Sequence, residues 1–307
     1  MPLQVSKSTL DLQFINNDQS AVYTKKGITY YVNANSGVDT RSGKSWRKAF
    51  LTMSKAFSVI ASGDTICFVG KIREQLVTPV QVFDVTVIGS GNRLGHADST
   101  PSGGQLAANT WSPPASGAVV GKATVRVLQQ GWKFNNILFT MESATVAGVE
   151  IVRDAAAGDS ERDASHTVVS GCRFAGAGIG VRCGVAALFT EIPNDVEVVG
   201  SLFMDTTTAI SGAIQGADWL VHQNYFRRNT NHIVAQFAGA HIVENIFSDH
   251  TTQSIDLNGG TGKNIITKNY LSGTFSEAGG YRKANANDEW AGNFNTLAGG
   301  ITVADPA

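Results

Sequence analysis

The chain has little charge for its length, with 24 Lys and Arg and 25 Asp and Glu among 307 residues, or 16% in all. Soluble proteins usually carry about a quarter, and no run of Lys or Arg stands out here. Binding to nucleic acid by neutralising phosphates therefore has little support, and we expect no nucleic-acid partner. The chain also lacks the ~18 consecutive apolar residues that a membrane span needs, so we expect no such span.

Cysteine is scarce, and its three copies, Cys67, Cys172 and Cys183, form no C-x-x-C pair. An odd number of widely spaced cysteines predicts buried thiols rather than a disulfide framework. The first residues do not show the basic segment and apolar run of a signal peptide, so we expect synthesis in a reducing cytosol.

The chain is rich in Gly, with 33 copies, and a short sequence motif recurs in its second half. Aligned on their closing residue, the five copies are TVVSGCRF ending at Phe174, VEVVGSLF at Phe203, WLVHQNYF at Phe226, HIVENIF at Phe247 and NIITKNYL at Leu271. The closing residues are 29, 23, 21 and 24 positions apart by subtraction. Periods of ~20–50 residues indicate solenoids and related repeat folds.

The columns of this alignment identify the kind of solenoid. Five places before the closing residue, every copy has a β-branched residue: Val169, Val198, Val221, Ile242 and Ile266. Two places before it stand Cys172, Ser201, Asn224, Asn245 and Asn269. The apolar spacing is not helical, so the period belongs to short strands separated by a corner. In a parallel β-solenoid with coils ~4.8 Å apart, like residues stack, and the Asn amides can bond between coils.

A helix is expected at the N-terminal end of this solenoid, where it would cover the open sheet edge. Residues 45–61 place one apolar stripe at helical spacing, with Ser45 as the N-cap and Gly63 just beyond the end. The stripe consists of Trp46, Phe50, Met53, Phe57 and Ile60.

Residues 30–70 resemble the opening of pectate-lyase-like right-handed β-helix proteins. In that family a Y-V-N strand, a G-x-D-x-x-S-G-x-S-W loop, a capping helix and a G-D-T-I strand follow in this order. The positions that fit are Tyr31, Val32, Asn33, Gly37, Asp39, Gly43, Trp46, Gly63, Asp64, Thr65 and Ile66. The resemblance implies an all-β fold, a single-stranded right-handed parallel β-helix with an N-terminal amphipathic capping helix. Two later stretches, GSGNRLGHADSTPSGG and QGWKFNNILF, are similar to β-helix proteins of tailed bacteriophages.

These patterns divide the chain into three parts. We expect an N-terminal arm over 1–29, the β-helix over 30–275, and a tail or oligomer contact over 276–307. Within the β-helix, Pro, Gly and Ser dominate residues 93–117, which we interpret as a long loop. Long loops on rigid scaffolds often carry binding residues, so Trp111 in this loop is a candidate ligand contact. Its alternative role is to pack the loop onto the rod.

Asp205 and Asp249 are the candidate catalytic residues. They share one column, two places after the closing residue, and would lie two coils apart at roughly 9.6 Å, near the upper end of the carboxylate separation in inverting glycosidases. Arg228 lies between them in that column, so an exposed Asp–Arg–Asp ladder is the simpler interpretation. Lyases of the resembled family use Asp-rich Ca²⁺ sites and an Arg base. Neither maps onto this sequence, so lyase activity is not carried over.

Aromatic side chains provide candidate sugar contacts. Tyr225 and Tyr270 each precede an inward-facing residue and should point outward, and Arg227 lies beside Tyr225. Tyr225 and Arg227 are therefore candidate ligand-binding residues, with isolated surface aromatics as the alternative. No metal-ligand spacing is found among the His and acidic residues, and we expect neither a metal nor a cofactor.

The resulting hypothesis is a non-enzymatic structural protein of a phage virion. It would be a tail-spike- or fibre-like appendage or a capsid decoration, made in the host cytoplasm and in contact with other tail or capsid proteins. The resemblance implies a homotrimer, and a host surface polysaccharide is a candidate ligand. The alternative hypothesis is a polysaccharide depolymerase, either a glycoside hydrolase or a lyase, built on the same β-helix.

Overall fold

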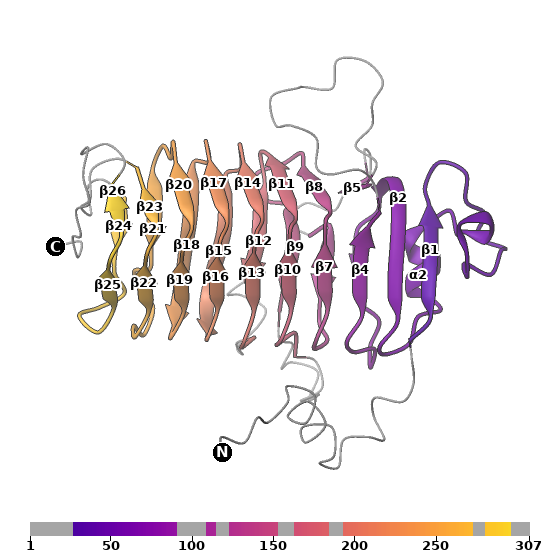
Figure 1. The fold of residues 1–307 in the computed structure, drawn as a ribbon, viewed down its shortest axis with the longest axis horizontal. Coiled ribbons are helices and arrows are strands. Elements are labelled where there is room, and N and C mark those ends of the chain that lie inside the picture. The colour runs from indigo at the N-terminus through magenta and orange to yellow at the C-terminus, as the bar shows by residue number, and fades with distance from the viewer. Residues whose placement is uncertain are drawn as a thin grey trace, which may run out of the picture.

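The computed structural model describes residues 27–90, 109–114, 123–152, 163–183, 193–272 and 280–295. These residues form one rod of stacked coils, in which strands far apart in sequence lie side by side along the long axis (Figure 1). Every pairing between the named strands is parallel, and among the described residues only two short segments are helical. The predicted class, a single-stranded right-handed parallel β-helix, is confirmed.

Three parallel sheets form the walls of the rod. Sheet A contains β1(Thr29–Asn33), β2(Thr65–Arg73), β4(Thr86–Gly89), β7(Lys133–Asn135), β10(Val168–Ser170), β13(Glu197–Val199), β16(Leu220–His222), β19(His241–Val243), β22(Ile265–Thr267) and β25(Glu289–Ala291). Sheet B shares β2 and continues with β5(Asn109–Ser112), β8(Leu138–Met141), β11(Arg173–Gly176), β14(Leu202–Met204), β17(Tyr225–Arg227), β20(Ile246–Ser248), β23(Tyr270–Leu271) and β26(Phe294–Asn295). Sheet C consists of β3(Leu76–Val77), β6(Val125–Val127), β9(Ala147–Ile151), β12(Ile179–Cys183), β15(Thr208–Ala217), β18(Asn231–Ala238), β21(Gln253–Asp256) and β24(Tyr281–Arg282).

The closing residues of the repeat stack inside the rod, as the alignment predicted. Phe174 pairs in register with Phe203, Phe203 with Phe226, and Phe226 with Phe247. Their ring centroids are 4.7, 5.0 and 4.6 Å apart, and neighbouring rings are within 7° of parallel. All four are buried, so each coil contributes one ring to a continuous core column.

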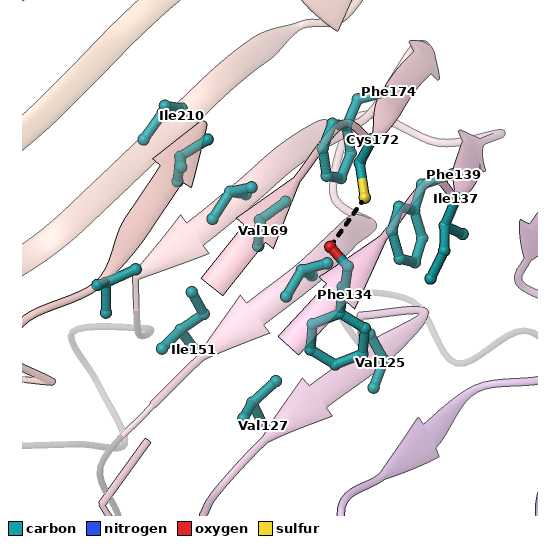
Figure 2. Packing of buried hydrophobic residues seen from close by; sticks show 14 of the residues in the cluster. Val125, Val127, Phe134, Ile137, Phe139, Ile151, Val169, Cys172, Phe174 and Ile210 are labelled. Atoms are coloured by element: carbon teal, nitrogen blue, oxygen red, sulfur yellow. Dashed lines mark hydrogen bonds between the residues drawn. The ribbon is translucent and has the colours of Figure 1, made fainter. Parts of the chain in front are cut away.

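The core continues through the N-terminal coils, where it is less regular. Figure 2 shows Phe134, Phe139 and Phe174 packed with aliphatic residues of sheets A and C, such as Val169 and Ile151. Cys172, which stands in the Asn column, is buried there, and its Sγ donates to the carbonyl oxygen of Phe134 at 3.3 Å. Burial raises the pKa of this thiol to about 12, so it is inert at neutral pH. Cys183 is also buried and Cys67 is half-buried, and all three thiols are free.

The predicted Asn column forms a hydrogen-bonded ladder at the corner between sheets A and B. The side-chain amide of Asn224 donates to Oδ1 of Asn245 at 3.0 Å, and Asn245 donates to Asn269 at the same distance. Each Oδ1 also accepts the backbone N–H of the Asn one coil earlier, at 2.9 and 3.0 Å. Asn293 extends the ladder by one further coil. The buried polar groups of this corner are thus paired between coils.

The residue before each ladder position adopts a left-handed backbone conformation. Its φ is +56° at Gly171, +57° at Gly200, +56° at Gln223, +59° at Glu244 and +56° at Lys268. This explains why the repeat has Gly or a variable polar residue there: the corner needs a conformation that β-branched residues disfavour.

The N-terminal cap differs from the continuous helix predicted over 45–61. A 3-10 turn, η1(Trp46–Lys48), is followed by extended backbone and then by the short helix α2(Met53–Phe57). The break occurs because Phe50 pairs with the edge of β1, donating its N–H to the carbonyl of Tyr31 at 2.9 Å. Side-chain capping comes from Thr52, since Ser45 makes no such bond. The stripe residues are buried except Trp46, which is 42% exposed.

The predicted C-terminal boundary at residue 275 is also corrected, because one more coil follows it. Trp290 pairs with Ile266, and Asn293 occupies the Asn ladder. The closing position of this coil is Asn295, opposite Leu271. The alignment missed the coil because a polar residue replaces the expected apolar one. The predicted arm over 1–29 lies outside the described residues except for its last three.

Candidate functional site: the outer face of sheet B

Strand alternation creates a second column on sheet B, outside the rod. On β14, β17 and β20 the middle residue is the inward-facing Phe, so the first residue of each strand points outward. Successive coils pair these first residues in register. We call this column the outer ladder, and its members are Leu202, Tyr225, Ile246, Tyr270 and Phe294.

The outer ladder is apolar and exposed over its central coils. Tyr225 is 38% exposed, Ile246 45% and Tyr270 48%, and all three count among the exposed large hydrophobic residues of the described chain. The ring of Tyr270 stacks on Phe294 with centroids 5.1 Å apart and planes 23° apart. The sequence prediction that Tyr225 and Tyr270 point outward is confirmed.

Polar side chains border the outer ladder on its sheet A side. Gln223, Glu244 and Lys268 occupy the left-handed corner, and all three are exposed. Gln223 donates from Nε2 to Glu244 Oε2 at 3.3 Å, and Lys268 Nζ lies 4.0 Å from Glu244 Oε1. These contacts keep the three side chains in a row parallel to the ladder.

Arg227 borders the ladder on its other side. It is the third residue of β17 and pairs in register with Met204 and Ser248. Because it lies two positions after Tyr225 on the same strand, it projects from the same outer face. The two predicted ligand-binding residues of this strand therefore lie together.

The candidate catalytic residues lie at the next corner of the coil. Arg228 binds Asp205 through two hydrogen bonds, at 2.9 Å from Nε and 3.0 Å from Nη2. Asp249 accepts a hydrogen bond from Ser248 Oγ at 3.2 Å. All three residues have left-handed backbone, with φ between +53° and +58°, so they form the corner itself. Both carboxylate oxygens of Asp205 are engaged by the guanidinium, which favours the ion-pair interpretation of this column.

The structure corrects the candidate role of Trp111. Residues 109–112 of the expected loop form β5, and Trp111 is fully buried. It pairs with Phe139 and so occupies the closing-residue column, and its Nε1 donates to the carbonyl of Glu74 at 3.0 Å. Trp111 is therefore a core residue, while the remainder of the expected loop over 93–117 lies outside the described residues apart from 113 and 114.

A buried charged cluster on sheet C was not anticipated from the sequence. The side chain of Glu150 is fully buried and lies 2.5 Å from Arg126 Nε and 2.7 Å from Arg182 Nη2. The three residues are cross-strand neighbours in successive coils. Aligning the less regular upstream coils would have revealed this Arg–Glu–Arg column. It lies on a different sheet from the outer ladder.

Neither a metal-binding cluster nor a membrane-spanning helix is found in the part of the chain that the structure describes. No group of three or more His, Cys, Asp or Glu side chains is arranged to hold a metal ion. Within the same residues, neither helical segment has the length or hydropathy to cross a membrane.

Comparison with known proteins identifies the fold but no family. The sequence matches no protein-family model and no curated protein. Among solved structures, YbhC of Escherichia coli matches with a TM-score of 0.55 and 13% identity, over 86% of this chain and 77% of that one. Pectate lyase Pel9A matches with a TM-score of 0.46 and 11% identity, over 87% and 74%. At 13% identity the likeness to YbhC describes the architecture alone.

Proposed function

We propose that the protein is a non-enzymatic structural protein of a bacteriophage virion. In this proposal it is a homotrimeric tail-spike- or fibre-like appendage or a capsid decoration, made in the host cytoplasm, that binds a host surface glycan. The phage-like stretches of the sequence and the resemblance of residues 30–70 motivate the virion and trimer assignments.

The observation that carries the glycan assignment is the outer ladder. Its exposed aromatic and aliphatic side chains form one row on the surface of the rod. Stacked rings and hydrogen-bonded amides hold the interior of the rod rigid beneath them. A rigid rod of this kind unfolds slowly and tolerates proteases, which suits a particle outside the cell. Because the backbone of the rod is already rigid, binding a ligand on its surface costs little additional conformational entropy.

The virion assignment is tested by quantitative mass spectrometry of purified particles from the phage that carries the gene. We expect the protein in every particle, at a few trimers for a tail appendage or at many copies for a capsid decoration. Absence from purified particles would overturn the virion assignment.

The depolymerase alternative is tested with the same protein and the surface polysaccharide of the host. We expect binding without new reducing ends or unsaturated sugars, because the carboxylate of Asp205 is engaged by Arg228. Sustained turnover that Asp205→Asn or Asp249→Asn abolishes would instead establish a glycosidase at this corner.

A further inference from the structure

The outer ladder has a width and a border that distinguish it from a protein-binding surface. It is one residue wide, with the charged corner residues Glu244 and Lys268 on one side and Arg227 on the other. Standard protein–protein interfaces bury ~800 Å² on each partner around a core depleted of charge. A single apolar column between polar columns is too narrow for such a core.

From this geometry we propose that one extended polysaccharide chain lies along the rod axis, over the outer ladder, and stacks on Tyr225 and Tyr270. This rests on the proposed glycan-binding function and specifies its site, its direction and the form of its ligand. The two tyrosines are two coils apart, roughly 9.6 Å, with Ile246 between them. Tyr270 and Phe294 extend the platform toward the C-terminal coil.

The chemistry of the border fits a sugar chain. A pyranose ring has a C–H face that packs on an aromatic ring and a rim of hydroxyl groups that needs hydrogen-bond partners. The amide of Gln223, the carboxylate of Glu244 and the ammonium of Lys268 supply donors and acceptors along one edge. Arg227 supplies donors along the other edge, where Ser248 Oγ, which donates to Asp249, can accept. A chain along the axis meets polar residues on both sides at the β17 and β20 coils.

The experiment uses the full-length protein and a microarray of purified bacterial capsular and lipopolysaccharide-derived polysaccharides. Binding is compared for the wild type, Tyr225→Ala, Tyr270→Ala and Tyr225→Phe, with Trp46→Ala as an exposed aromatic control on the N-terminal cap. Oligosaccharides of increasing length, cut from the polysaccharide that binds, are then titrated against each variant. Thermal unfolding verifies that every variant is folded, which we expect because the substituted side chains are on the surface.

We expect each Tyr→Ala variant to weaken binding about tenfold or more. Tyr225→Phe keeps the stacking ring and should lose less affinity than Tyr225→Ala, while Trp46→Ala should remain within about twofold of the wild type. Affinity should rise with oligosaccharide length until one chain reaches both tyrosines. Affinity that is independent of length contradicts the axial direction.

Three other results overturn the proposal in different ways. Wild-type binding that both Tyr→Ala variants retain moves the glycan to another surface and leaves the proposed function standing. If the wild type binds no polysaccharide, the glycan-binding function fails together with the site. If sedimentation shows an oligomer that dissociates in the Tyr→Ala variants, the outer ladder is an interface between copies of this chain.

Discussion

At the scale of single residues, His232 is the most unusual side chain inside the rod. It lies on β18, is fully buried, and has ring centroids 5.8 Å from Phe226 and 5.6 Å from Phe247. Its other neighbours are His250 at 5.5 Å between ring centroids, and Ser254, whose Oγ is 3.4 Å from Nδ1. Burial, with a smaller contribution from the charge of His250, lowers the pKa of His232 to about 3.

This pKa makes the stability of the rod sensitive to acid. The folded-state pKa is below the ordinary histidine value of 6.5, so between these values the unfolded chain binds the extra proton. The contribution of neutral His232 to the free energy of unfolding is therefore fully present above pH 6.5. This contribution is lost as the pH falls toward 3. From pH 7 to pH 4 this one residue should reduce the free energy of unfolding by about 3 kcal/mol.

His232→Leu tests this expectation through the pH dependence of urea unfolding. The variant should lose much of the decline that the wild type shows between pH 7 and pH 4, whatever its stability at pH 7. The matched control is His241→Leu, which removes an exposed histidine from the outer face of sheet A and shows the effect of a His→Leu change on the surface of the rod. Equal slopes in the wild type and His232→Leu would refute the assignment.

At the scale of elements, the N-terminal cap protects the first strand of sheet A. Phe50 pairs with the edge of β1 through its backbone, and its buried ring lies 6.0 Å from Tyr30 between centroids. Glu74 accepts the N–H groups of Met53 and Ser54 at 2.8 Å, which fixes the first turn of α2. Without this cover β1 would offer unpaired backbone groups to another chain.

Phe50→Ala should therefore destabilise the cap and promote association. Removing a buried Phe side chain costs about 3–5 kcal/mol, and the loosened cap would uncover the edge of β1. We expect faster aggregation by light scattering on mild heating, together with a lower unfolding temperature. Trp46→Ala, which removes a partly exposed ring that contacts Tyr31 at 4.8 Å between centroids, should change both quantities less than Phe50→Ala does. Unchanged aggregation in Phe50→Ala would show that the edge is protected by other means.

At the scale of the whole molecule, each coil contacts mainly the coils before and after it. Stability in such a solenoid is approximately a sum of coil terms and nearest-neighbour terms. A defect in the middle of the rod therefore interrupts the stack on both sides, whereas a defect in the last coil frays only that end. The Asn ladder has a member in the middle of the rod, Asn245, and one in the last coil, Asn293. The same substitution can therefore be made at a central and at a terminal position.

Asn245→Leu should lower the free energy of unfolding by about 3 kcal/mol, because it leaves the buried N–H groups of Asn224 without their acceptor. Asn293→Leu removes the equivalent acceptor at the C-terminal end of the ladder. Native-state hydrogen exchange should show faster opening throughout the central coils in the first variant and only beyond about residue 265 in the second. Similar exchange patterns in both variants would contradict nearest-neighbour coupling.

The repeat columns were predictable because equivalent residues pack in the same way in every coil. Phe203, Phe226 and Phe247 recur at the same place because a ring there must stack on the ring below. The Asn column was predictable for the same reason, since each amide bonds to its copy in the next coil as well as to a backbone carbonyl. Asn295 broke the pattern, and the coil that it closes was therefore assigned to the tail.

The candidate site was predictable only in part. Alternation along β17 placed Tyr225 and Arg227 on the surface, and the spacing placed Arg228 beside Asp205. Trp111 was misplaced because Pro and Gly around it indicate a loop, whereas its ring fills the column that Phe139 continues. Ile246 shares the alignment column of the two tyrosines, and its 45% exposure in the structure joins the three into one exposed ladder.

The sequence by itself determined the architecture, because the spacing of apolar and Asn positions is a local property that the strand ladder repeats from coil to coil. Only the tertiary structure decided which side chains stand exposed together and where the helical cap breaks. Those outcomes depend on contacts between residues far apart in the chain, such as Phe50 with Tyr31 or Tyr270 with Phe294. No local pattern records such contacts, because each arises only when the coils are stacked.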